Sequence, residues 1–321
     1  MIRIVFMGTP EFAIPCLEAI KQSGNSLVAI VTQPDKPRGR GNIMTPSPVK
    51  EWGIREGIPV FQPVKVRNDY DFMSSIRLLE PDLVVTAAFG QILPQEFLDI
   101  PSLGCINVHA SLLPKYRGAS PIQHALINGE KVTGITIIYM DAGMDTGDII
   151  AARKISIGDD ENAGELHDRL ACLGGELLLE VIKRFEKGKP EGVPQDHEKA
   201  TYCGKIDKSM GEIDWDKKAY DIRNMIRGLT PWPGAFTYYS GKRLKVWKAA
   251  EREYLTLNQY EPGTVILANE RDGLVVRCRD GVLQLLELQG EGGRRMTAEE
   301  YLRGNPILEG TRLGQPNRED S

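Results

Sequence analysis

The sequence predicts an α/β protein, with a doubly wound, mostly parallel sheet followed by a small OB-type β-barrel domain. Two patterns carry this prediction. The first half alternates short apolar runs with segments of helical periodicity, and the second half holds short strand patterns separated by Gly, Pro or Asp turns. At 321 residues the chain is long enough for two domains that each bury a core.

The apolar runs of the first half have the length of strands, and several are rich in β-branched residues. We expect strands at 2–7, 26–32, 83–88, 105–109 and 134–139. Helical spacing follows the first run, over 11–21, and a long helix with a leucine stripe is expected at 163–185. Ser47-Pro48 predicts another helix start, because Ser caps a helix and Pro suits its first position. Strands that alternate with helices indicate a parallel sheet covered on both faces.

Polar and turn-forming residues dominate the segment 187–200, which predicts a linker. A short helix is expected after it at 217–227. Five short strands follow, at 235–239, 244–249, 263–268, 273–278 and 282–288. This pattern alone favours an OB-type barrel and also allows a sandwich. We therefore expect a catalytic domain at 1–189, a linker at 190–204 and a second domain at 205–321.

Composition disfavours several classes of protein. The chain is 41% hydrophobic and 26% charged, and no apolar run approaches the roughly 20 residues that a membrane span needs. The first apolar run is too short for a signal peptide. The five cysteines are scattered without a Cys-x-x-Cys pair, so we expect no zinc site and a reducing, cytoplasmic location. Gly8-Thr9-Pro10 lacks the pattern of a dinucleotide fingerprint, which disfavours a nicotinamide-dependent oxidoreductase.

Three side chains indicate chemistry. Asn107 and His109 lie two residues apart on the predicted strand 105–109 and therefore point to the same side. Asp145 follows in a later turn sequence. Each of them alone is weak evidence, because most single histidines are ordinary core or surface residues and Asp-Thr-Gly-Asp is also a good turn. Together, an amide donor, an imidazole and a carboxylate are the groups that acyl transfer through a tetrahedral intermediate needs.

The sequence around these residues resembles a known family. Asn107-x-His109 is followed at once by Ser111-Leu112-Leu113-Pro114-x-Tyr116-Arg117-Gly118, and later by Met140-Asp141-x-Gly143-x-Asp145-Thr146-Gly147-Asp148. This is similar to the signature of the 10-formyltetrahydrofolate-dependent formyltransferases, with no departure at the key positions. Pro231-Trp232-Pro233 and Lys245-Val246-Trp247-Lys248-Ala249 resemble the C-terminal domain of the tRNA-specific members, so the resemblance covers essentially the whole chain.

The resemblance implies a Rossmann-like formyltransferase domain and a reaction. A formyl group would pass from 10-formyltetrahydrofolate to the α-amino group of methionyl initiator tRNA, in support of translation initiation, by a cytoplasmic enzyme that is a monomer and uses no metal. One alternative is an N-formyltransferase for a small amine such as an aminosugar nucleotide. A deformylase would carry an extra domain ahead of the catalytic one, and here the catalytic pattern starts at Met1. A non-catalytic tRNA-binding protein would not need the three polar residues together.

The resemblance also implies roles for residues. Asn107 would donate to the developing oxyanion with His109 beside it, and Asp145 would pair with His109 and help relay the proton. Which of His109 and Asp145 is the immediate base stays open. The folate contacts are expected at Ser111, Leu112, Leu113, Pro114, Phe89, Gly90 and Ile92.

Charge distribution indicates a nucleic-acid partner. Residues 201–250 hold ten basic and five acidic side chains, although the whole chain carries a net charge of −4. The long loop 33–42 is also basic, and it resembles the loop that meets the acceptor stem in tRNA-specific members. The expected tRNA contacts are Arg38, Arg40, Lys205, Lys208, Lys245 and Lys248.

Overall fold

A computed structural model describes residues 1–38, 41, 43–253, 259–269 and 271–314. The chain divides into two compact units. The first unit comprises Met1–Pro121, Val132–Ser156 and His167–Gly204, and the second comprises Ile122–Lys131, Ile157–Leu166 and Lys205–Ser321. The second unit therefore takes in two segments that interrupt the first unit in the sequence.

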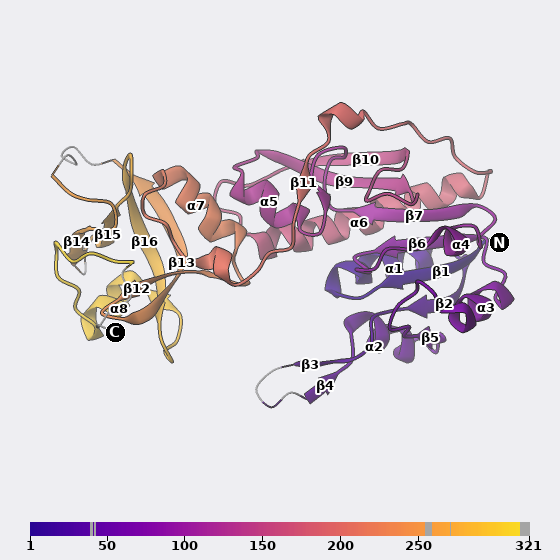
Figure 1. Cartoon of the computed structure of the whole chain (residues 1–321), viewed down its shortest axis with the longest axis horizontal. Helices are drawn as coiled ribbons and strands as arrows, with labels where there is room; N and C mark the ends of the chain where they lie inside the picture. The colour runs from indigo at the N-terminus through magenta and orange to yellow at the C-terminus, as the bar shows by residue number, and fades with distance from the viewer. Residues whose placement is uncertain (39–40, 42, 254–258, 270, 315–321) are drawn as a thin grey trace. The chain divides into compact units, whose positions relative to one another are not determined.

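A seven-stranded sheet forms the centre of the first unit, in the order β10-β9-β7-β6-β1-β2-β5 (Figure 1). The strands are β1 (Arg3–Gly8), β2 (Ser26–Val31), β5 (Val60–Phe61), β6 (Leu83–Ala87), β7 (Gly104–His109), β9 (Val132–Tyr139) and β10 (Ile149–Ser156). The five strands from β7 to β5 pair in parallel, whereas β9 and β10 are antiparallel to their neighbours. The predicted mostly parallel sheet is confirmed.

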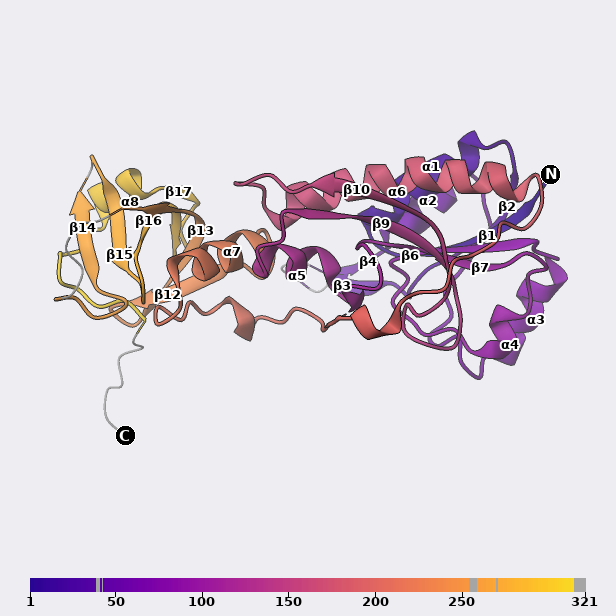
Figure 2. The ribbon, with the colours of Figure 1, turned by 90° about the horizontal axis from the view of Figure 1, so that it is seen from above.

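Helices cover both faces of this sheet, with α1, α2 and α6 on one side and α3 and α4 on the other (Figure 2). Their bounds are α1 (Ile14–Gln22), α2 (Pro48–Arg55), α3 (Tyr70–Leu78), α4 (Gln95–Leu98) and α6 (Ala163–Phe185). The apolar side chains that β1 turns toward α3 and α4 pack against Phe72, Met73 and Phe97. Ser47 caps α2 by accepting from the Lys50 N–H at 3.1 Å, as the sequence predicts.

The strand order reverses at β1. The chain passes from β1 to β2 and β5 on one side, and then crosses to β6 and β7 on the other. Ligands of open α/β sheets bind outside the carboxyl ends of the strands at such a switch point. The carboxyl ends of β1, β6 and β7 lie together here, because Gly8 pairs with Ala87 and Thr86 pairs with Asn107.

Some elements of the first unit lack a clear pattern. β5 has only two residues, and the alternating exposure of β10 follows the half-exposed edge of the sheet. Two short strand pairs lie outside this sheet, namely β3 (Lys36–Arg38) with β4 (Ile43–Thr45) and β8 (Arg117–Gly118) with β11 (Tyr202–Cys203). The helix α5 (Pro121–Ile127) belongs mostly to the second unit. Short or half-exposed strands give little periodic signal, which is why the sequence does not predict them.

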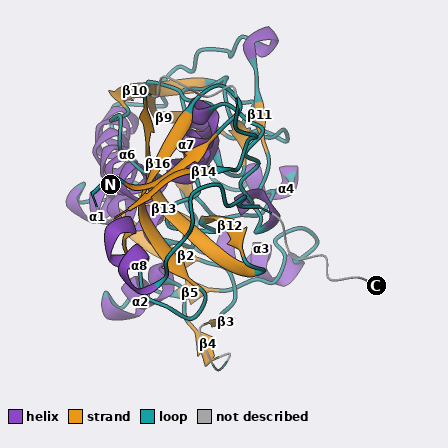
Figure 3. Cartoon of the chain, turned by 90° about the vertical axis from the view of Figure 1, so that its left-hand side faces the viewer, coloured by secondary structure: helices purple, strands orange, loops and turns teal. Residues whose placement is uncertain are grey.

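An antiparallel sheet forms the second unit, with strand order β12-β13-β16-β15-β14 and β17 paired to β16. Figure 3 draws its strands in orange and labels β12, β13, β14 and β16. The strands are β12 (Ala235–Tyr239), β13 (Lys242–Arg252), β14 (Val265–Asn269), β15 (Gly273–Arg277), β16 (Val282–Gly290) and β17 (Met296–Thr297), and the helices are α7 (Ala219–Gly228) and α8 (Ala298–Gly304). The five strands and the helix predicted here are confirmed. In the described part of the chain, no helix combines the length and apolarity that crossing a bilayer requires.

Candidate active site

The three polar residues predicted to act together do lie together. Asn107 and His109 come from β7, and Asp145 comes from the loop between β9 and β10. Asn107 Nδ2 donates to Asp145 Oδ1 at 3.2 Å, and His109 Nδ1 lies 3.6 Å from Asp145 Oδ2. The His109 side chain is 6% exposed and that of Asp145 is 17% exposed, so both contacts are largely shielded from water.

The orientation of the Asn107 amide follows from its partners. A carboxylate only accepts, so the amide nitrogen faces Asp145 and the amide oxygen faces away from it. Asn107 Oδ1 accepts from the hydroxyl of the buried Thr86 at 2.8 Å. One of the two Nδ2 hydrogens is therefore used by Asp145, and the other has no partner among the described residues.

The tautomer of His109 follows in the same way. His109 Nε2 lies 2.9 Å from the carbonyl oxygen of Tyr116, which can only accept, so Nε2 carries a hydrogen. In the neutral ring Nδ1 is then the nitrogen without a hydrogen, and it faces Asp145. The Tyr116 carbonyl also accepts from Cys203 Sγ at 3.5 Å, and burial raises the pKa of that thiol, which keeps it protonated.

The backbone of Asp145 is unusual, with a φ of 53° in the left-handed region that residues with a side chain rarely adopt. Gln195 Nε2 donates to the Asp145 carbonyl at 2.9 Å, and the Gly118 N–H donates to Asp145 Oδ2 at 2.9 Å. Two residues later Gly147 passes so close to β9 that a Cβ there would lie 1.9 Å from the Tyr139 carbonyl oxygen. The loop therefore requires glycine at position 147. Asp145 is held by hydrogen-bond donors that lie outside the loop, on Gln195 and Gly118.

The predicted folate contacts on the turn 111–114 are mostly buried. Ser111 is 1% exposed, and its hydroxyl donates to the Lys115 carbonyl at 2.7 Å. Thr136 Oγ1 donates to the Ser111 carbonyl at 2.7 Å and accepts from the Leu113 N–H at 3.1 Å. These groups hold the turn together, and Leu112 and Pro114, which are partly exposed, are the members of the turn with surface for a ligand.

The predicted contacts after β6 differ in exposure. Phe89 is 5% exposed and packs in the core beside α3 and α4, whereas Ile92 is 73% exposed and Gly90 is also exposed. The Phe89 carbonyl accepts from Gln33 Nε2 at 3.2 Å and from Thr9 Oγ1 at 3.5 Å. These bonds join the loops after β1, β2 and β6 at the switch point. Phe89 thus contacts the neighbouring loops through its carbonyl, whereas the Ile92 side chain is an apolar group exposed at the surface.

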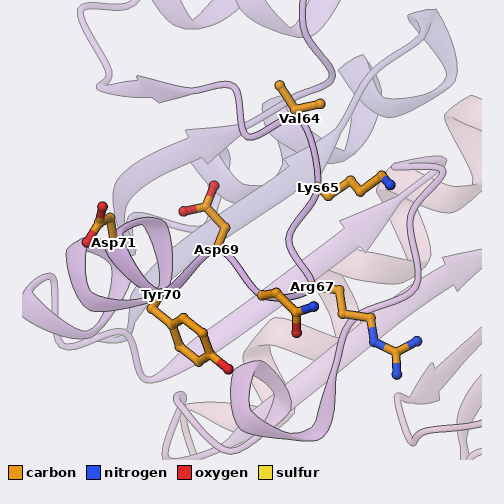
Figure 4. A pocket seen from close by; sticks show the side chains of 7 residues that line it. Val64, Lys65, Arg67, Asp69, Tyr70 and Asp71 are labelled. Atoms are coloured by element: carbon orange, nitrogen blue, oxygen red, sulfur yellow. The ribbon is translucent and has the colours of Figure 1, made fainter.

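A shallow pocket of about 480 Å³ lies on the loop after β5 and the start of α3, lined by residues 64–65 and 67–71 (Figure 4). It contains none of the predicted site residues. Among the described residues, no group of three or more His, Cys, Asp or Glu side chains is placed to hold a metal ion.

The lysines of the second unit that are predicted to contact tRNA are exposed or partly exposed. Lys205 and Lys208 are exposed, and Lys245 is partly exposed with its Nζ 5.2 Å from the centre of the Trp247 ring. Lys248 is exposed but lies 3.8 Å from Asp160, which offsets part of its charge. Arg40 and the side chain of Arg38 lie outside the described residues.

Two of the basic side chains counted in 201–250 are structural. Arg227 is 6% exposed and donates to Asn224 at 2.9 Å and to the carbonyls of Gly158 and Glu161. Burial lowers the pKa of its guanidinium. The Arg223 side chain is 14% exposed and pairs with Asp160 at 2.8 Å. Neither guanidinium is free to meet a phosphate.

Another set of cations was not predicted as a site. A cavity of about 630 Å³ in the second unit is lined by Lys217, Lys218 and Arg279 together with Asp221 and Met225, among others. Arg279 lies in the turn between β15 and β16, far along the sequence from the two lysines. Its part in this cluster therefore leaves no signal in local charge counts.

Comparison with known proteins gives matches along the chain. The formyl transferase family matches residues 2–182, and the formyl transferase C-terminal domain matches residues 205–306. The methionyl-tRNA formyltransferase of Acetivibrio thermocellus is 55% identical over 313 residues, which cover 98% of this chain and 100% of that protein. The methionyl-tRNA formyltransferase of Caldanaerobacter subterraneus subsp. tengcongensis is 51% identical over 311 residues, 97% of this chain and 99% of that protein.

A solved structure shares the fold. The N-formyltransferase of Helicobacter canadensis, in complex with folinic acid and dTDP-3-aminofucose, superposes with a TM-score of 0.67. The alignment covers 92% of this chain and 100% of that chain at 19% identity. At this level of identity the likeness establishes a common architecture.

Proposed function

The chain belongs to the formyl transferase family, and we propose that it transfers the formyl group of 10-formyltetrahydrofolate to the α-amine of methionine on initiator tRNA. Formylation of methionyl-tRNA, which the sequence predicts, is confirmed by relatives that match nearly the full chain at 55% and 51% identity. Beyond this, we propose that the formyl donor is the 10-formyl isomer of the folate and that the acceptor is the initiator tRNA. The roles given below to individual residues are also part of the proposal.

The proposal rests mainly on the contacts that Asp145 makes with Asn107 and His109. A carboxylate within 3.2 Å of an amide nitrogen and 3.6 Å of an imidazole nitrogen brings an oxyanion donor and a proton carrier to one place. The three residues lie at the carboxyl edge of the parallel strands beside the switch point, where open α/β sheets bind ligands.

Asn107 donates its second Nδ2 hydrogen to the formyl oxygen, where negative charge develops as the amine attacks. Removal of one such donor typically lowers the rate by about 10²–10³. His109 Nδ1 and Asp145 relay the proton that the attacking amine loses to N10 of the folate. The bond between N10 and the formyl carbon breaks as N10 takes this proton, and tetrahydrofolate leaves. An ordinary α-amine has a pKa near 8, so a useful fraction of free amine exists at neutral pH.

The exposed surface of Ile92 and the partly exposed Leu112 supply apolar contacts for the pterin at this edge. An apolar wall with few convergent polar groups is the usual form of a small-molecule site. The neighbouring N10 carries the formyl group, and Asn107 then faces it from β7. The residues present therefore suit a folate donor.

Lysines of the second unit contact the phosphate backbone of the tRNA. Lys205, Lys208 and Lys245 make no ion pair among the described residues, so their charge is available to phosphates. Lys217, Lys218 and Arg279 add a second cluster. From the resemblance, Arg38 and Arg40 meet the acceptor stem. The enzyme acts as a cytoplasmic monomer, a setting that suits its free cysteines.

The test is a comparison of formyl acceptors with one donor. Methionyl initiator tRNA, glycinamide ribonucleotide and an aminosugar nucleotide are each incubated with the enzyme and 10-formyltetrahydrofolate, and formylated product is measured. We expect product on the tRNA alone. Efficient formylation of the aminosugar nucleotide without product on tRNA would overturn the proposal. An Asp145→Ala enzyme serves as the blank, because it keeps both binding surfaces.

A further inference from the structure

Arg117 is a buried cation at the edge of the active site that meets only neutral acceptors. Its side chain is 1% exposed. Nε and Nη2 donate to Gln195 Oε1 at 3.2 and 2.7 Å, Nη2 also donates to His197 Nδ1 at 3.1 Å, and Nη1 donates to the Tyr202 hydroxyl at 3.4 Å. No carboxylate among the described residues pairs with it. Because a buried charge without a counter-ion is costly, this arrangement calls for a function.

Gln195 connects Arg117 to the loop that carries Asp145. Its side chain is 6% exposed, and Nε2 donates to the carbonyls of Asp145 and Gly147 at 2.9 and 2.7 Å. Arg117 can only donate and the two carbonyls can only accept, so the orientation of the Gln195 amide is fixed. Both amide hydrogens and both oxygen lone pairs are used.

The backbone beside Arg117 contacts the Asp145 carboxylate and the His109 ring. The Gly118 N–H donates to Asp145 Oδ2 at 2.9 Å, and the Tyr116 carbonyl accepts from His109 Nε2 at 2.9 Å. Arg117 itself is anchored by its N–H, which donates to the Thr201 carbonyl at 2.9 Å, and by the pairing of β8 with β11. Residues 116–118 thus contact both members of the His109–Asp145 pair.

Asp145 needs this support because of its backbone. A residue with a side chain and a φ of 53° persists only where its surroundings determine the conformation. The Gln195 bond to the Asp145 carbonyl fixes the peptide that follows Asp145, and the Gly118 bond fixes its carboxylate.

We propose that Arg117 and Gln195 are positioning residues for the transfer step, which set the Asp145 carboxylate against Asn107 and His109. This inference rests on the proposed function, because it assumes that Asp145 acts in the reaction. It assigns a catalytic purpose to the segment 190–204, which the sequence predicts as a linker. A misplacement of about 1 Å can lower a rate by about 10².

The decisive variant is Gln195→Glu, because the side chains of Glu and Gln have nearly the same shape. The new carboxylate would still accept from Arg117 and would give the buried cation a counter-ion, so folding should be preserved. It would lose both donors to the Asp145 and Gly147 carbonyls. The carboxylate oxygen that would face the two carbonyl oxygens should lower the thermal stability, and the new ion pair with Arg117 should offset part of this loss. We expect a folded enzyme with KM for tRNA and folate within about twofold of the parent and kcat lower by about 10²-fold. A structural role alone predicts normal kcat in this variant, and that result would overturn the inference.

The matched control is Tyr202→Phe. Tyr202 contacts Arg117 at 3.4 Å, its side chain is largely exposed, and it has no bond to the Asp145 loop. We expect its kcat to stay within about twofold of the parent. A loss as large as that of Gln195→Glu would overturn the role assigned to the Gln195 bonds, because any disturbance of the groups around Arg117 would then lower kcat equally.

A double-mutant cycle separates this inference from the proposed function. If Gln195 acts through Asp145, Gln195→Glu should have little further effect on the residual rate of an Asp145→Ala enzyme. Additive losses would overturn the inference and leave the role of Asp145 intact. Normal turnover of the Asp145→Ala enzyme would overturn the proposed role of Asp145, and the inference with it.

Discussion

His109 donates through Nε2 to the carbonyl oxygen of Tyr116 at 2.9 Å, which leaves Nδ1 as the nitrogen that faces Asp145. A backbone carbonyl cannot donate, so this contact selects one tautomer of the neutral ring. The family resemblance implies that the imidazole lies beside the carboxylate but does not say which nitrogen would exchange a proton. The bond to Tyr116 leaves Nδ1 for that proposed role.

The first prediction concerns this tautomer. When its ring is neutral, His109 should carry its hydrogen on Nε2. The ¹⁵N chemical shifts of the labelled ring report which nitrogen carries the hydrogen. His167, whose Nδ1 lies 2.9 Å from the carboxylate of Asp168, is the internal comparison and should carry its hydrogen on Nδ1. A His109 ring protonated on Nδ1 alone would contradict the geometry.

The second prediction concerns the three catalytic residues. Asn107→Ala, His109→Ala and Asp145→Ala should each lower kcat by at least about 10²-fold, because each removes a contact made mainly in the transition state. Steady-state kinetics with methionyl initiator tRNA provide the measurement, and circular dichroism checks the fold. Near-normal turnover of any one variant would remove that residue from the mechanism.

Much of the fold could be predicted because its strands and helices follow regular patterns of apolar residues over short stretches of sequence. The parallel strands are continuous apolar runs, and the five strands of the second unit are bounded by turn residues, so both give a clear pattern. The trio of Asn107, His109 and Asp145 was found through its sequence context. Their proximity could not be derived from spacing, since the two halves of the motif meet only when β7 and β9 pair.

Other features depend on long-range contacts that local sequence does not encode. Gln195 lies in a Gly- and Pro-rich stretch, and its bonds to the Asp145 loop leave no periodic signal. Phe89 follows an apolar strand, so sequence does not show whether it faces a ligand or the core, and it lies in the core. Counting charges likewise cannot tell the buried Arg227 from an exposed lysine.

The third prediction concerns Arg227. Arg227→Met should lower the free energy of unfolding by about 2–4 kcal/mol, because it removes the donors that Arg227 supplies to the buried Asn224 oxygen and to two carbonyls. Urea denaturation measures this loss. Arg252→Met is the control, since Arg252 pairs with the half-exposed Asp272 at 3.1 Å, and such a pair contributes about 1 kcal/mol or less. Equal losses in the two variants would contradict the structural role of Arg227.

The fourth prediction concerns the thiols. Burial raises the pKa of Cys16, Cys105 and Cys278 to about 12, so at pH 8 only about 10⁻⁴ of each is the reactive thiolate. Cys172 on α6 is exposed. In the native enzyme, iodoacetamide should therefore modify Cys172 first, as mass spectrometry of the digested protein can show. Equally fast modification of Cys16 would contradict its burial, and unfolding in urea should make all five react.

The last prediction concerns salt and the tRNA. If Lys205 and Lys245 contact phosphates, log affinity should fall linearly with log salt, and each lysine replaced by Ala should flatten that slope by about 0.7 to 0.9 unit. Lys248→Ala should have a smaller effect, because Asp160 already lies 3.8 Å from its ammonium. Lys21 is the control, since it pairs with Glu56 at 2.7 Å in the first unit and should leave the slope unchanged. Binding measured over a series of salt concentrations decides the matter. Should Lys21→Ala flatten the slope as much as Lys245→Ala, the effect would reflect net charge alone, and the second unit would lose its place as the surface that holds the tRNA.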